Sequence, residues 1–149
     1  MWLPQRGDAF FSREDPQLRA PRKYMIVYAD VQSGKEGRRF HEALQQVSGE
    51  YESEKYEHLA ALKARLKQVH WYRDLHVYVF LADTRERLET LLGLGSLLED
   101  RKIVLILPDD AKATYSLGFR MYPRFVTLMP GRYHDLCSVL TEMFRTKDR

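Results

Sequence analysis

Apolar residues gather in short continuous runs along this chain, separated by longer stretches in which apolar and polar residues are mixed. Four runs rich in β-branched and aromatic residues cover residues 24–29, 75–82, 102–107 and 124–128. Continuous apolar runs of this length predict strands that are buried on both faces, as in a parallel sheet covered by helices. A weaker alternation over residues 50–56 predicts a shorter fifth strand at an edge of the sheet.

The stretches between these runs carry apolar residues at the spacing of amphipathic helices. They predict five helices: residues 36–47, residues 57–69, a helix opening at Asp83–Glu86, a short helix or turn over 111–117, and residues 133–144. Helical crossovers of this size require parallel pairing of the strands and are right-handed. The sequence therefore predicts an α/β fold, a three-layer α/β/α sandwich whose five-stranded parallel sheet has the flavodoxin-like order 2-1-3-4-5.

The domain organisation follows from length and composition. A chain of 149 residues is long enough for one domain with a single well-buried core. Residues 1–23 hold three prolines and many charges without a sustained apolar period, which predicts a flexible N-terminal arm. Residues 24–149 are then expected to form the α/β domain.

Charge and hydropathy exclude several classes of partner. The net charge is only +3, and basic residues are mixed with nearly as many acidic ones, so we expect no nucleic-acid partner. No run approaches the roughly 20 apolar residues of a membrane-spanning helix. The first residues lack the apolar core of a secretory signal. We therefore expect a cytoplasmic protein that does not associate with membranes.

The single cysteine and the histidines give no clear catalytic or metal-binding pattern. Cys137 lies in a predicted amphipathic helix, where an isolated cysteine is usually a small buried apolar residue. The five histidines fall in different elements without the spacing of metal ligands, so we predict neither a metal site nor a catalytic residue among them. His76 lies inside an apolar run and is expected to be a hydrogen-bonded residue of the core or its edge.

Three of the apolar runs end at aspartates, namely Asp30, Asp83 and Asp109. Ligands of parallel α/β sheets bind beyond the carboxyl ends of the strands, so these side chains form a candidate acidic cleft. In the predicted strand order Asp30 and Asp83 leave neighbouring strands, and two carboxylates could hold Mg²⁺. Alternatively, Asp83 is a helix N-cap and Asp30 stabilises a turn, and this is the interpretation we favour.

Over residues 24–146 this arrangement resembles the receiver domain of two-component response regulators. The resemblance implies that Asp83 stands at the position of the phosphoacceptor and Asp30 at that of a Mg²⁺-binding acid. Met129-Pro130, followed by a helix that opens at Tyr133, resembles the Lys-Pro junction of the family.

The chain departs from the receiver pattern at several places, and the loop after Asp83 also lacks the family's Met-Pro and Asp-Gly features. Val31 replaces a second acid after the first strand, Leu107 and Pro108 replace the hydroxyl residue that ends the fourth strand, and Met129 replaces the lysine. A phosphoryl group on Asp83 would therefore lack the ammonium and hydroxyl partners that stabilise it. The resemblance favours a non-catalytic, receiver-like domain that binds another protein in a regulatory or signalling pathway.

Receivers commonly associate through their fourth and fifth helices and fifth strand, and this implies where a partner would bind. The candidate partner surface consists of Tyr115, Phe119, Arg120, Tyr122 and Tyr133. The expected partner is another protein or a second copy of the chain.

A rival hypothesis rests on the loop after the first strand. Ser33, Gly34 and Lys35 could present backbone N–H groups to an anion at a helix N-terminus. Flavodoxins bind the phosphate of FMN at this place, so a small enzyme or carrier for a nucleotide or flavin is the alternative function. The spacing does not match a Walker A motif, and an ordinary strand–helix loop is the favoured interpretation. We expect no cofactor, with Mg²⁺ and FMN as the alternatives.

Overall fold

The computed structural model describes residues 20–129 and 133–145. Its strands are β1 (Lys23–Tyr28), β2 (Glu52–Tyr56), β3 (Leu75–Leu81), β4 (Lys102–Leu107) and β5 (Phe125–Leu128). They form one parallel sheet in the order β2-β1-β3-β4-β5, with the carboxyl ends of all strands at the same edge. The predicted strand order is confirmed. Residues 1–19 of the predicted N-terminal arm lie outside the described residues, and so does Pro130.

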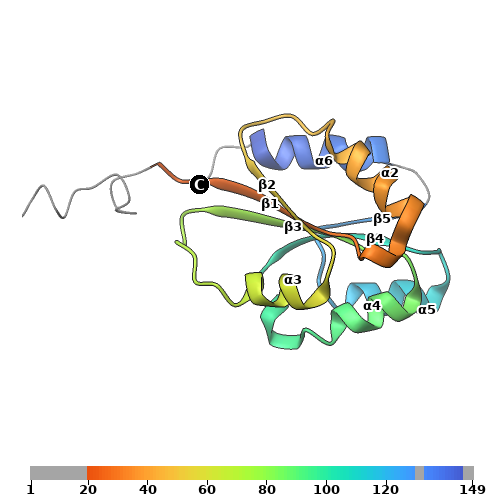
Figure 1. The fold of residues 1–149 in the computed structure, drawn as a ribbon. Helices are drawn as coiled ribbons and strands as arrows, with labels where there is room; N and C mark the ends of the chain where they lie inside the picture. The colour runs from red at the N-terminus through yellow and green to blue at the C-terminus, as the bar shows by residue number, and fades with distance from the viewer. Residues whose placement is uncertain (1–19, 130–132, 146–149) are drawn as a thin grey trace, which may run out of the picture.

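The helices are α2 (Gly34–Leu44), α3 (Leu59–Leu66), α4 (Arg85–Leu92), α5 (Lys112–Phe119) and α6 (Tyr133–Arg145), with 3₁₀ turns η1 (Val31–Ser33) and η2 (Gly95–Leu98). Helices α2 and α6 cover one face of the sheet, and α3, α4 and α5 cover the other (Figure 1). The predicted three-layer sandwich is confirmed. Each crossover carries the chain from one strand to the next through a helix, as parallel pairing requires.

The core consists of two apolar clusters, one on each face of the sheet. Successive strand residues point to opposite faces, so Val27 packs with Phe40 of α2 on one side while Ile26 packs with Leu62 of α3 on the other. Strands β1, β3 and β4 are almost fully buried. A fully buried side chain of this size contributes about 1.5–3 kcal/mol to folding. These two clusters explain why the apolar runs are continuous rather than alternating.

The two edge strands differ in character. In β2, Glu52 and Lys55 are exposed, and charged side chains on an edge strand discourage pairing with other chains. In β5 all four residues are partly buried, and none of them is charged. The short strand predicted at residues 50–56 is therefore the charged edge, and β5 is the apolar one.

Helix boundaries differ from the predicted ones by a few residues. Helix α3 begins at Leu59 rather than at Glu57, because the N–H of Val31 donates to the carbonyl of Glu57 (2.9 Å) and holds that residue outside the helix. The same helix ends at Leu66, so Val69 is 99% exposed instead of packing on the core. Helix α2 starts at Gly34, two residues before the predicted start.

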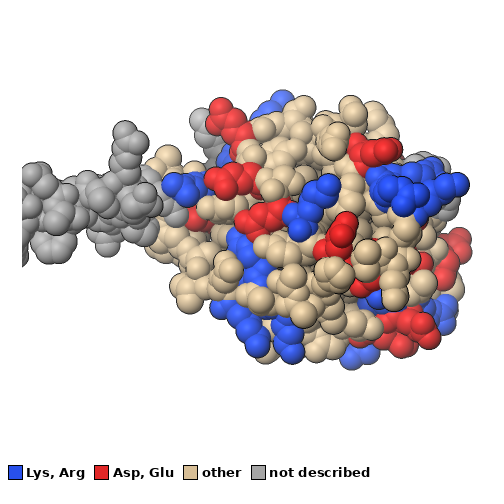
Figure 2. Space-filling model, viewed as in Figure 1, with Lys and Arg blue, Asp and Glu red and all other residues tan. Residues whose placement is uncertain are grey.

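The surface mixes charges of both signs. Basic and acidic side chains lie side by side over much of the face seen in Figure 2, in keeping with the small net charge of +3. Within the described ranges, no helix combines the length and the apolar character that crossing a membrane requires.

Candidate functional site

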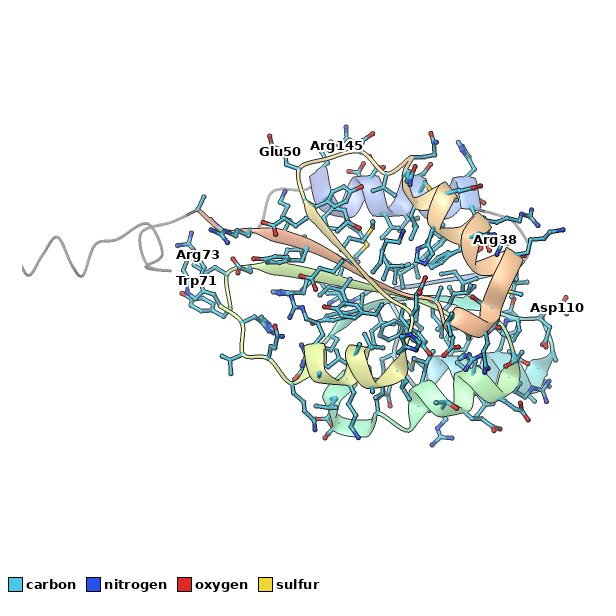
Figure 3. All side chains as sticks on the ribbon, viewed as in Figure 1. Arg38, Glu50, Trp71, Arg73, Asp110 and Arg145 are labelled. Atoms are coloured by element: carbon cyan, nitrogen blue, oxygen red, sulfur yellow. The ribbon has the colours of Figure 1, made fainter. Side chains whose placement is uncertain are left out.

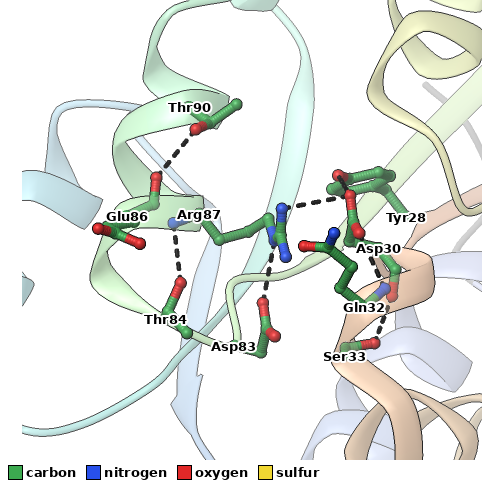
Figure 4. Close-up of polar contacts among 9 residues, drawn as sticks. All are labelled: Tyr28, Asp30, Gln32, Ser33, Asp83, Thr84, Glu86, Arg87 and Thr90. Atoms are coloured by element: carbon green, nitrogen blue, oxygen red, sulfur yellow. Dashed lines mark hydrogen bonds and ion pairs between the residues drawn. The ribbon is translucent and has the colours of Figure 1, made fainter.

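Asp30 lies two residues beyond the end of β1 and stabilises the turn that follows the strand. Its Oδ1 accepts a hydrogen bond from the backbone N–H of Gln32 (2.9 Å), which makes Asp30 the cap of η1 (Figure 4). Its Oδ2 accepts a hydrogen bond from the Tyr28 hydroxyl (2.7 Å). The predicted turn-forming role of Asp30 is confirmed.

Asp83 lies beyond β3 but is not the N-cap of the next helix. The N-cap of α4 is Thr84, whose hydroxyl oxygen accepts a hydrogen bond from the N–H of Arg87 (3.0 Å). The prediction that Asp83 is the N-cap of this helix is wrong, because the next residue takes that role. The Asp83 carboxylate instead accepts a hydrogen bond from Nε of Arg87 (3.1 Å), one helical turn away.

Arg87 joins the two aspartates. Its Nη1 lies 3.2 Å from Oδ2 of Asp30 while its Nε binds Asp83, so one guanidinium spans the ends of β1 and β3 (Figure 4). The neighbouring positions of these strands in the sheet bring the two carboxylates within reach of the same side chain. All three side chains are largely shielded from solvent, with 18% of the Arg87 side chain and 13% of each aspartate exposed. The acidic pair is thus compensated by a cation of the chain itself.

The electrostatics of this cluster follow from its hydrogen bonds. Burial by itself would raise the pKa of Asp30, but the Gln32 N–H, the Tyr28 hydroxyl and the Arg87 charge together hold it below its usual value. Burial and the adjacent Asp30 carboxylate raise the pKa of Tyr28 well above its normal range. Burial opposes the charge of Arg87, and the two carboxylates more than offset it, which raises the pKa of the guanidinium. The cluster is a stable ion pair at neutral pH.

Asp109 belongs to a separate cluster. Its Oδ1 accepts a hydrogen bond from the N–H of Ala111 (3.0 Å) at the start of α5. The Thr114 side chain forms a further hydrogen bond to Asp109 and holds its pKa below the usual value. Arg85 donates from Nε to the Thr114 hydroxyl (3.1 Å). The three aspartates therefore form two clusters, one closed by Arg87 and one at the start of α5.

The loop after β1 uses its polar groups within the chain. The Ser33 hydroxyl donates to the carbonyl of Asp30 (2.6 Å), and the Ser33 N–H donates to the same carbonyl (2.8 Å). Gly34 has a φ of 57°, a conformation that favours glycine. Lys35 is exposed. The Ser33 hydroxyl is thus engaged by Asp30 at the position where a phosphate-binding loop would present it.

Two of the residues that depart from the receiver pattern follow or end strands of the sheet. Leu107 ends β4 and is fully buried, and Met129 follows β5 and packs against the core. Tyr133 is also buried, because it packs against Phe40 and its hydroxyl donates to Glu36 of α2. Tyr133 therefore joins α6 to α2 and is not part of the exposed surface.

The remaining candidates for the partner surface lie together around the end of α5. We define the α5 aromatic surface as Tyr115, Phe119, Arg120 and Tyr122. The rings of Tyr115 and Phe119 stack at 5.9 Å, and 54% of Phe119 and 84% of Tyr122 are exposed. Tyr122 has a φ of 53°, an uncommon conformation for a bulky residue. Two large rings are therefore exposed between the end of α5 and the start of the apolar edge strand β5.

Sequence analysis missed Arg87 as the residue that closes the acidic cluster. Its spacing of four residues from Asp83 on a predicted helix was a usable signal, because such residues face each other. Within the described part of the chain, no three or more His, Cys, Asp or Glu residues are placed to hold a metal ion together. The isolated Cys137 is buried as predicted, and its thiol donates to the carbonyl of Ala43 (3.0 Å).

Comparisons with known proteins identify the fold. No protein-family model and no curated protein sequence matches this chain. A crystal structure of CpaE from Burkholderia thailandensis E264, named for a suggested role in pilus assembly, matches with a TM-score of 0.51 and 15% identity. The match covers 84% of this chain and 99% of that one. The shared feature is the fold.

A second crystal structure gives a weaker match. It belongs to a protein of Burkholderia pseudomallei K96243 that is named for a suggested relation to pilus assembly. Its TM-score is 0.49 at 12% identity, and the match covers 86% of this chain and 92% of that one.

Proposed function

We propose that this chain is a non-catalytic, receiver-like domain that binds a second copy of itself and is not switched by phosphorylation. The observation that carries the proposal is the position of Arg87, which neutralises the two carboxylates at the carboxyl ends of β1 and β3. In a receiver, this place belongs to Mg²⁺ and the phosphoryl group. A domain that supplies its own cation there has no need of a metal to stabilise the acidic pair.

The residues around this cluster support the absence of phosphoryl chemistry. Met129 and Leu107 offer neither an ammonium nor a hydroxyl to a phosphoryl group on Asp83. Charge-assisted partners of this kind supply much of the stabilisation of such groups. A Mg²⁺ ion would also have to displace the guanidinium from both carboxylates. The fold of a receiver is therefore kept without its switch.

The α5 aromatic surface supports the binding role. Phe119 and Tyr122 are exposed, and so are Arg120 and Arg124, which follow them closely in the sequence. Aromatic residues and arginines are enriched at interfaces, and they attract each other through cation–π contacts. Because the surface offers both groups, two copies related by a two-fold axis could pair the rings of one with the guanidinium groups of the other. A place in a multi-protein assembly, which the name of the CpaE neighbour suggests for that protein, agrees with this role.

Sedimentation velocity over a range of concentrations tests the binding role. We expect the wild type to shift from monomer to dimer as the concentration rises, and Phe119→Ala and Tyr122→Ala each to remain monomeric. The matched control is Tyr72→Ala, since Tyr72 is 85% exposed on a different loop. A wild type that stays monomeric at the highest concentration, or a dimer unaffected by both α5 variants, would contradict the proposal.

Incubation with acetyl phosphate and Mg²⁺ tests the absence of phosphorylation. We expect the intact mass of the wild type to stay unchanged. The Arg87→Ala variant is compared with the wild type, because it removes the cation from both carboxylates and leaves Asp83 itself unchanged. A phosphoryl adduct on the wild type that disappears in Asp83→Asn would refute the proposal.

The flavin-carrier alternative is tested in parallel. The bond between the Ser33 hydroxyl and the Asp30 carbonyl speaks against a phosphate site in this loop. We expect purified protein to have no flavin absorbance and FMN to leave its melting temperature unchanged. A stabilisation by FMN that Lys35→Ala abolishes would support the alternative instead.

A further inference from the structure

The loop between α3 and β3 carries large side chains that the rest of the domain leaves uncovered. Val69 is 99% exposed and Tyr72 is 85% exposed, the two highest values among the large apolar side chains of the described residues. Trp71, between them, is partly exposed. Figure 3 places Trp71 and Arg73 at one end of the molecule and Asp110 at the other. Exposed apolar side chains that gather on one loop mark a site of interaction.

A turn fixes the aromatic side chains of this loop. The N–H of Asp74 donates to the carbonyl of Trp71 (3.0 Å), and the Asp74 carboxylate accepts a hydrogen bond from the N–H of Arg22 (2.9 Å). The rings of Trp71 and Tyr72 meet edge to face at 6.0 Å. The Arg73 guanidinium lies over the Trp71 ring, 5.2 Å from its centroid. The loop therefore presents rings and a cation together.

The stretch that leads through this loop is basic and holds no acidic residue. Residues 58–73 contain two lysines and two arginines, but neither aspartate nor glutamate. Arg65 is buried and pairs with Glu54, whereas Lys63, Lys67 and Arg73 are exposed and form no ion pair with another described residue. Figure 2 shows basic side chains gathered over α3. Three cations without a counter-charge therefore accompany the exposed rings.

Acidic residues bound this surface on the side of β4. Glu99 and Asp100, which precede that strand, line a cavity together with Tyr72. Lys63 and Lys67 lie one helical turn apart on α3, so their side chains share a face of the helix. A negatively charged partner would therefore be met by α3 and the loop rather than by the residues before β4.

We propose that this surface binds the interface of an anionic lipid bilayer. We define the α3–β3 loop surface as Lys63, Lys67, Val69, Trp71, Tyr72 and Arg73. Tryptophan and tyrosine are enriched at membrane interfaces, because their rings are apolar and carry one polar group. The cations would lie among the anionic headgroups, while Val69 and the rings enter the boundary with the acyl chains.

Val69 favours a lipid surface over a nucleic acid. An aliphatic side chain does not stack on bases, and three cations are few for a phosphate backbone. Insertion at the acyl boundary would remove the exposed Val69 side chain from water. The sequence predicted no membrane association because the net charge is small and no run could span a bilayer. A peripheral site requires neither feature, and this one is separate from the α5 aromatic surface.

Co-sedimentation with lipid vesicles tests the proposal, at a protein concentration where the wild type is monomeric. We expect the full chain to bind vesicles of equal parts phosphatidylcholine and phosphatidylglycerol, and to bind pure phosphatidylcholine much less. Lys67→Glu should weaken binding by about tenfold, since it reverses one charge at the headgroups. Its matched control is Lys112→Glu, an exposed lysine at the start of α5.

The aromatic residues are tested by a paired comparison. Tyr72→Ala should weaken vesicle binding several-fold and leave dimer formation intact, whereas Tyr122→Ala, at a residue of similar exposure, should do the opposite. The chain has two tryptophans, so Trp2→Phe leaves Trp71 as the only indole. Its fluorescence should shift to shorter wavelength when the mixed vesicles are added.

Three results would overturn the proposal. The first is that the wild type does not bind the mixed vesicles. The second is that Lys67→Glu and Tyr72→Ala weaken binding no more than their controls, or that Trp71 fluorescence does not change on binding. The third is that a single-stranded oligonucleotide binds this surface and displaces the vesicles, which would indicate a nucleic-acid site. None of these results bears on the sedimentation velocity or phosphorylation experiments, so the proposed function is tested separately.

Discussion

Arg87 decides the chemistry of the acidic residues at the carboxyl edge of the sheet. Carboxylates that would otherwise repel each other share one guanidinium, and each keeps a hydrogen bond to it or an ion pair with it. Arginine suits this place because its planar guanidinium presents several donors and stays charged at any ordinary pH. The pair of aspartates is therefore explained as part of the fold.

Replacing Arg87 tests how much the cluster contributes to stability. Arg87→Ala leaves two shielded carboxylates without their counter-charge, so we expect a loss of about 2 kcal/mol in the free energy of unfolding. Urea denaturation measures this difference. The control is Arg145→Ala, which breaks an ion pair whose partners are 72% and 61% exposed and should change stability by less than about 0.5 kcal/mol. Equal effects of the two variants would show that Arg87 has no special role.

His76 predicts a dependence of stability on pH. Its pKa is about 4 in the folded protein and 6.5 in an unfolded chain, because burial, His70 and Arg65 outweigh the opposing Asp74 and Glu54. The unfolded chain therefore binds the proton first as the pH falls. The stability from neutral His76 is complete above pH 6.5 and is lost on acidification towards pH 4.

The pKa shift of His76 corresponds to a loss of up to about 3 kcal/mol in the free energy of unfolding between pH 6.5 and about pH 4. Urea unfolding at several pH values measures it, and His76→Phe should flatten the slope in the upper part of the window, where acidic residues do not yet titrate. His134→Phe, which alters an exposed imidazole, should leave the slope as it is in the wild type. An unchanged slope in His76→Phe would assign the dependence to other groups.

At the scale of elements, the sequence predicted the strands better than the helix ends or the site. The central strands are buried on both faces, so runs such as 75–82 and 102–107 are unmistakable. The end of α3 was placed too late because Val69 continues the apolar period although it lies beyond the helix. The bridge from Arg87 to Asp30 depends on β1 and β3 being neighbours, which no local pattern reveals. The burial of His76 likewise depends on packing against Tyr24 and His70.

Helix α5 approaches the sheet closely at Gly118. A Cβ at this position would lie 3.0 Å from a methyl group of Leu107 and 3.2 Å from one of Leu105, both in the core. We expect Gly118→Ala to lower the free energy of unfolding by about 1 kcal/mol. Overpacking of the core costs about 1–3 kcal/mol, which exceeds the gain of about 1 kcal/mol from the higher helix propensity of alanine. Thermal unfolding measures this loss, and the exposed Ser116→Ala in the same helix should be neutral or slightly stabilising. A stabilised Gly118→Ala would show that the leucines relax without cost.

At the scale of the whole molecule, the acidic cluster and the proposed binding surface occupy different parts of one sheet. The carboxyl end is closed by Arg87, and the α5 aromatic surface flanks the apolar edge strand β5. The opposite edge, β2, carries exposed charges that discourage strand pairing. This asymmetry gives the molecule one edge suited to association and one protected from it.

The layered architecture also predicts how stability is distributed. Strands β1, β3 and β4 are each paired on both sides and covered on both faces, whereas β2 and β5 are paired on one side only. Amides of β3 should therefore exchange with solvent only through global unfolding, and those of β2 through smaller openings of lower free energy. Native-state hydrogen exchange by NMR measures both. In a dimer formed through the α5 aromatic surface, β5 should gain protection as the concentration rises, while β2 should not. Equal protection of the two edges at all concentrations would contradict both the assigned interface and the asymmetry of the sheet.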